Sequence, residues 1–317
     1  MTVIAGVDVG GTKTSAVLLG EDRALAAVTS VPTDASGPGG VYESTTHAIE
    51  ELAAAGSVLR LDALGIGIAG LVDNRRGTVN HAVNLGINDV PLEIGSLLAD
   101  RFGTVTNVEN DVNASALGAY VQMSASEEID DLAYLSIGTG IAAGVVLNGR
   151  LHRGRRGVAG EIGHLPVAAG GPECACGLRG CLEAVASGRA IERAWPVAAG
   201  RNSATELFAA SRRDEAAARV AGEIADHLAG AILLLAVTYD AERVVLGGGV
   251  AEARTPLREA VDDGLRRLER RSAFVRALEL PARLRLCADE PIGAIGAAVA
   301  AAGRLPQGTA PRPRAEQ

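Results

Sequence analysis

The chain has 317 residues, of which 48% are hydrophobic and 3% aromatic, and its formal net charge is −8. It is long enough for two domains with cores of Ala, Val, Leu and Ile. The acidic balance, without a block of Lys and Arg, argues against nucleic acid as the main partner. An apolar strand begins at once, so we expect no secretion signal, and the longest apolar run, 228–237, is too short to span a membrane. We therefore expect a cytoplasmic protein, and clustered thiols fit that reducing compartment.

Apolar runs and glycine stops predict alternating strands and helices. In the first part we expect strands at 3–9, 14–19, 24–30, 63–69 and 105–108, and helices at 41–55, 92–102 and 112–122. In the second part we expect strands at 132–137, 141–147, 244–246 and 284–287, and helices at 182–195, 216–237, 255–267 and 293–302. A strand, a glycine turn and a second strand open both parts. This repeat predicts an α/β protein of two similar halves that face a shared cleft.

The glycine turns are candidates for binding phosphate, because backbone N–H groups there can approach phosphate oxygens without an intervening Cβ. An ordinary hairpin explains either turn alone better, but two turns at equivalent points of a repeat favour a nucleotide. A third glycine run could lie against an adenine ring or be a plain loop. The candidate residues are Gly10, Gly11, Thr12, Gly138, Thr139, Gly140, Gly247, Gly248 and Gly249.

Acidic side chains stand beside the predicted cleft. Asp8 precedes the first turn, where it could hold Mg²⁺ through water or simply cap the turn. Asn110 and Asp111 lie at a junction of strand and helix, where such residues are also favoured as helix caps. At the carboxyl end of a strand they would face a ligand, and Asp111 could accept the proton of a hydroxyl during phosphoryl transfer.

One histidine and three of the four cysteines follow the spacing His-x9-Cys-x-Cys-x4-Cys, at His164, Cys174, Cys176 and Cys181. Imidazole and thiolate ligands in a set of four are typical of a structural zinc site. A disulfide or reactive thiols would be the alternative. Two acids flank the cluster, Glu161 and Glu183. On a metal-bound loop they would suit a ligand with several hydroxyls, although composition alone favours ordinary solvated acids.

Together these motifs resemble the ROK family of sugar kinases and repressors, within the actin-like ATPase and hexokinase superfamily. The matching stretches are residues 8–13, 109–111, 136–140, 160–164, 174–177 and 181–183. The resemblance implies two actin-like, ribonuclease H-like lobes around a central cleft. It also implies ATP and Mg²⁺ in that cleft, a structural Zn²⁺, and transfer of the γ-phosphate to a hexose hydroxyl.

The resemblance assigns roles to individual residues. Asp111 would be the general base, and Lys13 would join the phosphate turns. The expected zinc ligands are those named above, with His164 also contacting the sugar. The expected sugar-binding residues are Gly70, Asn84, Asn110, Asp111, Glu161, His164 and Glu183. The implied lobes are residues 1–111 with about 291–305, and 112–290 with the zinc loop, followed by a tail at 306–317.

The chain departs from the family pattern at several positions. Ala142 and Ala143 replace a common Gly-Gly, Ala69 replaces a common Pro, and Ile87 a common Trp. The last two lie in the expected sugar pocket, so glucose is the default substrate and is not deduced from the sequence. An N-acetylhexosamine such as GlcNAc or ManNAc, another hexose or a cyclitol are alternatives, as is polyphosphate as donor.

Other classes of function are less compatible with the sequence. A non-catalytic sugar-sensing protein is disfavoured because Asp8, Asp111 and the glycine turns are intact. A repressor would need a helix-turn-helix segment before the strand at 3–9. The expected partners are a small sugar and ATP, and the resemblance implies a homodimer or homotetramer.

Overall fold

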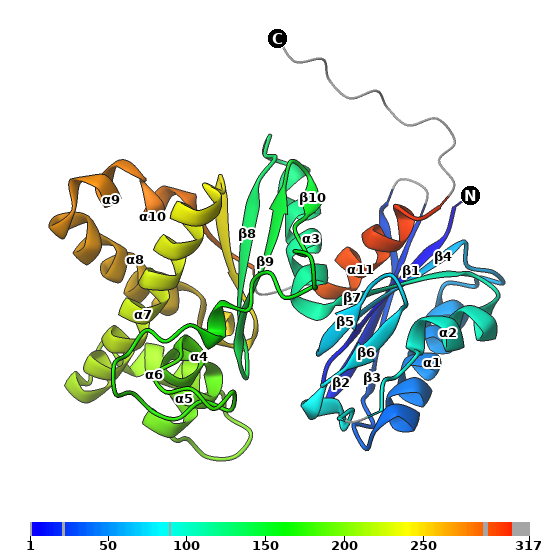
Figure 1. The fold of residues 1–317 in the computed structure, drawn as a ribbon, viewed down its shortest axis with the longest axis horizontal. Coiled ribbons are helices and arrows are strands. Elements are labelled where there is room, and N and C mark those ends of the chain that lie inside the picture. Colours follow the sequence, from blue (N-terminus) through cyan, green and yellow to red (C-terminus); the bar gives the residue numbers. More distant parts are fainter. Residues whose placement is uncertain (1, 21–22, 89, 288–290, 306–317) are drawn as a thin grey trace, which may run out of the picture. The chain divides into compact units, whose positions relative to one another are not determined.

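The computed structural model describes residues 2–20, 23–88, 90–287 and 291–305 (Figure 1). It divides into two compact units, a first unit of Met1–Asp111 with Ala297–Gln317 and a second unit of Val112–Gly296. The sequence placed the second boundary near residue 291, whereas the structure places it within a helix, between Gly296 and Ala297. The predicted tail lies outside the described residues.

The first unit is built on a mixed sheet of strand order β3-β2-β1-β4-β7. Its elements are β1 (Ile4–Val9), β2 (Lys13–Leu19), β3 (Leu25–Pro32), α1 (Pro38–Ala55), β4 (Ala63–Ile68), β5 (Leu71–Asp73), β6 (Thr78–Asn80), the 3₁₀ turn η1 (Val83–Leu85), α2 (Ile94–Phe102) and β7 (Val105–Asn110). Strands β1, β2 and β3 pair antiparallel, whereas β4 pairs parallel with both β1 and β7.

Alternation along the strands places the core of the first unit on one face of its sheet. Leu64, Ile66 and Ile68 of β4 are buried with the apolar sides of α1 and α2 (Figure 1). Gly65 points to the other face, where a Cβ would collide with the backbone of Ala297 in the last helix. The sheet of the first unit is therefore covered on both faces.

The second unit repeats this topology, with strand order β10-β9-β8-β11-β12. Its elements are α3 (Asp111–Ser124, starting at the boundary), β8 (Leu132–Ile137), β9 (Ile141–Leu147), β10 (Arg150–Leu151), η2 (Ile162–His164), α4 (Leu182–Ala186), α5 (Gly188–Ala194), α6 (Ser203–Ala210), α7 (Glu215–Tyr239), β11 (Arg243–Gly247), η3 (Gly249–Ala253), α8 (Arg254–Arg271), α9 (Ala273–Ala277), α10 (Leu280–Arg283) and β12 (Leu284–Leu286). Helix α11 (Ile292–Ala302) crosses the boundary. The strand directions also match those of the first unit. The repeat predicted from the sequence is present.

The structure differs from the predicted elements where they are short or interrupted. The hairpin of β5 and β6 was not predicted, because three-residue strands leave little periodicity. The predicted helix 182–195 is broken at Ser187, whose backbone is extended and whose hydroxyl oxygen caps α5 by accepting the N–H of Ala190.

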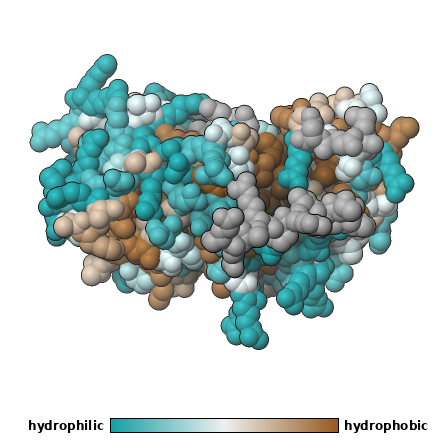
Figure 2. Space-filling view, turned by 90° about the horizontal axis from the view of Figure 1, so that it is seen from above, coloured by the Kyte–Doolittle hydropathy of each residue, from teal (hydrophilic) through white to brown (hydrophobic). Residues whose placement is uncertain are grey.

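Helix α7 is the one helix among the described residues that is long and apolar enough to cross a membrane, by length and composition alone. Its apolar side packs in the core of the second unit against α4, α6 and α8. The face of the molecule seen in Figure 2 shows hydrophilic side chains interspersed with smaller apolar areas. A buried core helix meets the same criteria, so α7 is weak evidence for a membrane.

Two mid-helix glycines provide a test of packing in the second unit. A Cβ on Gly118 of α3 would collide with the backbone of Ile292, whereas nothing lies within 4 Å of a Cβ on Gly222 of α7. Gly222→Ala should raise the free energy of unfolding by about 0.5–1 kcal/mol through helix propensity alone. Gly118→Ala should instead lower it by about 1–3 kcal/mol. Urea denaturation of both variants measures the difference, and a Gly118 variant as stable as that of Gly222 would contradict this packing.

Candidate active site

In the first unit, acidic residues gather where β1 and β7 end. The in-register strands place Asp8, Gly67 and Glu109 side by side. Asp8 is half-buried, and its pKa is raised to about 7. Burial is the main cause, the negative charge of Asp111 adds to it, and the positive charge of Lys13 partly opposes it. A carboxyl group with this pKa lacks enough positive charge around it, and a divalent cation would supply that charge. The surroundings of Asp8 therefore fit the predicted magnesium position.

The first glycine turn follows β1 and lies against the expected sugar loop. The N–H of Gly10 donates to the carbonyl of Lys13 (3.0 Å), which closes the turn. A Cβ on Gly11 would lie only 3.3 Å from the backbone oxygen of Asn84, so glycine allows this approach. Gly11, Thr12 and Lys13 are exposed, as is Asn84. A phosphate-binding candidate and a sugar-binding candidate are thus neighbours within one unit.

Two further predicted sugar residues meet beside Asp111. The Asn110 side-chain amide donates to the carbonyl of Gly70 (3.4 Å), and the Asn110 N–H donates to the Glu109 carboxylate (3.2 Å). Gly70 has φ +115° and lies so close to Ala82 that a Cβ would overlap it. The segment between β4 and β5 is therefore tied to the end of β7.

A polar network behind β7 was not predicted from the sequence. The Asn74 amide donates to the carbonyl of Val108 (2.6 Å) and to the side chain of Asn107 (3.1 Å), and it lies 3.4 Å from Glu109. Arg304 in turn donates to the backbone and side-chain oxygens of Asn74 (2.8 and 2.6 Å). Because these residues come from distant parts of the chain, only a polar residue in a turn, Asn74, could have suggested the network.

In the second unit, the second glycine turn joins β8 to β9. The N–H of Gly138 donates to the carbonyl of Gly140 (3.0 Å), and Thr139 is exposed. Glu183 lies against this turn, where its carboxylate accepts the N–H of Ile141 (3.1 Å). The sequence placed Glu183 with the sugar but did not predict its contact with the turn.

The segment that carries Glu161 and His164 runs along β9 on the side where β10 pairs with only the last two residues of that strand. The N–H of Ala143 donates to the carbonyl of Gly160 (2.7 Å). A Cβ on Gly160 or Gly163 would collide with a β9 carbonyl, so both glycines are needed for this approach. The turn η2 then presents Glu161 to solvent and His164 to the cysteines.

Three of the four predicted zinc ligands, His164, Cys174 and Cys176, form one group in the second unit, and Cys181 lies next to Cys176. Nδ1 of His164 lies 3.7 Å from Sγ of Cys174, and Sγ of Cys176 lies 3.7 Å from Sγ of Cys181. The ligand atoms of His164, Cys174 and Cys176 all lie within 4.8 Å of one another. Zn–S bonds of 2.3 Å in a tetrahedron place neighbouring sulfurs about 3.8 Å apart, whereas a disulfide needs about 2.05 Å. These distances fit a metal better than the disulfide alternative, and all three cysteines are free.

The protonation of the thiols also fits a metal. Burial raises the pKa of Cys181 to about 12, with neighbouring thiols adding to the effect, whereas a backbone hydrogen bond at Leu178 lowers the pKa of the exposed Cys176. Packed thiols are difficult to ionise without a nearby cation, and Zn²⁺ binds them as thiolates.

The third glycine run, 247–249, ends β11 and begins η3. A Cβ on Gly247 would overlap Tyr134, and a Cβ on Gly248 would overlap the backbone of Ile137. A Cβ on Gly249 would meet nothing within 4 Å. The first two glycines therefore have a packing role, and Gly249 offers open backbone next to Asn202, which donates to its carbonyl (3.1 Å).

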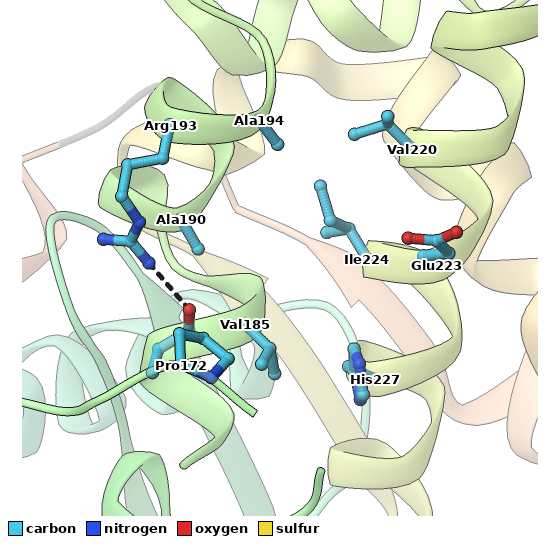
Figure 3. A pocket seen from close by; sticks show the side chains of 10 residues that line it. Pro172, Val185, Ala190, Arg193, Ala194, Val220, Glu223, Ile224 and His227 are labelled. Atoms are coloured by element: carbon cyan, nitrogen blue, oxygen red, sulfur yellow. Dashed lines mark hydrogen bonds between the residues drawn. The ribbon is translucent and has the colours of Figure 1, made fainter. Parts of the chain in front are cut away.

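A cavity of about 350 Å³ lies between α4 and α5 on one side and α7 on the other (Figure 3). Apolar side chains such as Val185 and Ile224 form its walls, with Arg193, Glu223 and His227 around them. None of its lining residues was predicted as a site residue.

The two repeated sheets, each with a glycine turn after its first strand, define an α/β protein of the actin-like ATPase fold. Residues 4–302 match the model of the ROK family, and the chain belongs to this family.

Two relatives that this chain matches over most of their length are sugar kinases. The chain is 35% identical over 258 residues to an N-acetylmannosamine kinase of Vibrio vulnificus (strain CMCP6). This match covers 80% of this chain and 85% of that protein. It is 34% identical over 281 residues to a glucokinase of Thermotoga maritima, covering 82% and 87%.

Two solved structures share the fold along nearly the whole chain. A ROK hexokinase from Thermus thermophilus has 34% identity and a TM-score of 0.74, and the match covers 95% of this chain and 98% of that chain. A ROK family glucokinase from Streptomyces griseus, solved with glucose and AMPPNP, has 28% identity and a TM-score of 0.75, with coverage of 95% and 99%.

The raised pKa of Asp8 predicts how stability depends on pH. Between the unfolded value of 3.8 and the folded value of about 7, the native state holds a proton that the unfolded state has lost. The free energy of unfolding of the wild type, relative to Asp8→Asn, should therefore fall as the pH rises from about 4 to about 7, and level off above. Urea denaturation across this range, without Mg²⁺, measures the difference, and a constant difference would contradict the raised pKa.

Metal analysis tests the cysteine cluster. The purified protein should contain about one zinc per chain, and Cys176→Ser should lose most of it, because a hydroxyl is a far weaker zinc ligand than a thiolate. Cys176 is exposed, so the change should disturb little packing. Cys287→Ser is the matched control and should keep the metal, since Cys287 is not one of the clustered ligands. Equal zinc content in the two variants would rule out this site.

Proposed function

We propose that this protein is an ATP-dependent sugar kinase that transfers the γ-phosphate of ATP to a hexose hydroxyl. The observation that carries the proposal is the meeting of Asp8, Asp111 and the first glycine turn within one unit, beside Asn84 and Asn110. Membership of the ROK family and the activities of its sugar-kinase relatives support the same reaction.

In this proposal Asp111 is the general base. It accepts the proton of the sugar hydroxyl while that oxygen forms a bond to the γ-phosphorus, and the bond from this phosphorus to the bridging oxygen of ADP breaks. Asn110 would orient the sugar through a hydroxyl. Gly70, Asn84, Glu161, His164 and Glu183 would hold the remaining hydroxyls.

The backbone N–H groups of the glycine turns would bind the phosphates, with Lys13 adding a positive charge and Gly249 next to adenine. Asp8 would hold Mg²⁺ through water, and the ion would neutralise phosphate charge during transfer. His164, Cys174, Cys176 and Cys181 would hold Zn²⁺ in a structural role.

Glucose is the proposed acceptor, with N-acetylmannosamine as the second candidate because a kinase of that sugar is as similar to this chain as a glucokinase is. Ile87, which replaces a Trp common in the family, is fully buried, so the loop with Asn84 is packed by an aliphatic side chain. A cytoplasmic location and a homodimer or homotetramer belong to the proposal as well.

The base role predicts the effect of Asp111→Asn. The amide cannot accept the proton, so kcat should fall by about 10²–10⁴-fold while the Kd for ATP stays nearly unchanged. Coupled-assay kinetics and calorimetry measure the two quantities. Asp100→Asn, an exposed acid of α2, is the control and should leave kcat at the wild-type level. Near-normal kcat in the Asp111 variant would remove this residue from the base role.

A screen of acceptors and donors tests the substrate. We expect phosphorylation of glucose with ATP, at a kcat/KM above that for N-acetylmannosamine, N-acetylglucosamine, mannose or a cyclitol. Polyphosphate replaces ATP in a second arm of the screen. A preference for N-acetylmannosamine would overturn glucose as acceptor but not the kinase reaction, whereas no transfer to any of these acceptors would overturn the reaction itself.

A further inference from the structure

The start of α4 and the start of α5 both contact the second glycine turn. From α4, the Glu183 carboxylate accepts the N–H of Ile141 at 3.1 Å. From α5, the N–H of Gly188 donates to the carbonyl of Gly138 at 2.8 Å. Both ends of the turn are therefore held by one segment of the chain, about forty to fifty residues further on.

The contact of Glu183 with the turn is close. A Cβ on Gly140 would overlap Oε2 of Glu183, the same atom that accepts the N–H of Ile141. A hydrogen bond to an ionised carboxylate is about twice as strong as one between neutral groups. The second oxygen, Oε1, has no hydrogen bond among the described residues and is left for another donor.

The helix that carries Glu183 is itself fixed. The N–H of Leu182 donates to the carbonyl of Leu165, next to the zinc-ligand candidate His164 (2.9 Å). Arg193 of α5 donates to the carbonyl of Ala184 (2.7 Å), the hydrogen bond drawn in Figure 3. Glu183 therefore projects from a helix that is held on one side by the cysteine-rich loop and on the other by α5.

We propose that Glu183 is a positioning residue for the second phosphate turn and that it couples nucleotide binding to sugar binding. Oε2 orients the turn, and Oε1 accepts a sugar hydroxyl. The inference rests on the proposed function, in which the 138–140 turn binds nucleotide phosphates. It adds that nucleotide affinity depends on Glu183 even when no sugar is present.

The test compares substitutions of Glu183 in the zinc-loaded protein, with the Kd for AMPPNP measured by calorimetry in the absence of sugar. Glu183→Ala should raise this Kd about tenfold or more, because the turn loses a hydrogen bond to a charged group. Glu183→Gln should stay within about threefold of the wild type, because its amide oxygen can still accept the N–H of Ile141. The Gln variant should nevertheless raise the KM for the sugar, since it has lost a carboxylate.

Hydrogen exchange supplies a second readout that does not depend on nucleotide. The amide of Ile141 should exchange faster in Glu183→Ala than in the wild type and should be restored in Glu183→Gln. If the Ala variant does not fold, Glu183→Asp replaces it, because the shorter side chain falls short of the N–H of Ile141.

The outcomes separate the inference from the proposed function. If the wild type binds AMPPNP and the Ala variant binds it equally well with unchanged exchange at Ile141, the inference is wrong and the kinase proposal stands. If the wild type binds no nucleotide, the proposed function fails together with the coupling, whereas faster exchange in the Ala variant would still support the positioning of the turn.

Discussion

The parallel, in-register pairing of β1, β4 and β7 is the constraint on which the site of the first unit depends. It aligns Asp8 with Gly67 and Glu109 and brings the carboxyl ends of the three strands to one edge. Because side chains alternate along a strand, a slip of one residue would turn Asp8 into the apolar core and turn Val7 and Val9 away from it. The apolar packing of β1 and β4 against α1 thus fixes the position of a charged group that takes no part in that packing.

The second unit relies on a different constraint for its functional loop. The segment that follows β10 has few buried side chains, and the small apolar cluster near it consists of Cys174, Cys181 and Ala184. Such a loop cannot be ordered by hydrophobic burial alone, because ordering each residue costs about 1–2 kcal/mol of backbone entropy. Four metal ligands in a short stretch would compensate for that cost, since metal-binding free energy becomes folding free energy.

Much of this architecture could be predicted from the sequence because the informative signals are local. Residues 132–137 and 141–147 read as two strands around a glycine turn, and the structure places β8 and β9 at the same bounds. The spacing of the cysteines is also a local signal, and it identified ligand candidates that lie close together in the structure. The contact of Arg304 with Asn74 depends on packing between segments 230 residues apart and has no local pattern. The break at Ser187 had a local signal, a Ser before a Gly, but it was hidden within a longer helical periodicity.

The proposed contact of one carboxylate with both a phosphate turn and a sugar would have consequences for the reaction. If Glu183 orders the turn through one oxygen and receives a sugar hydroxyl on the other, each ligand reduces the conformational freedom that the next must remove. The coupling free energy is reciprocal, so the factor by which sugar tightens nucleotide binding equals the factor by which nucleotide tightens sugar binding. A kinase gains from this arrangement, because a nucleotide bound without the sugar meets a less ordered turn and is less exposed to wasteful transfer to water. In the proposed zinc-bound protein the metal would have a second effect, since the loop that it would order also supports the helix from which Glu183 projects.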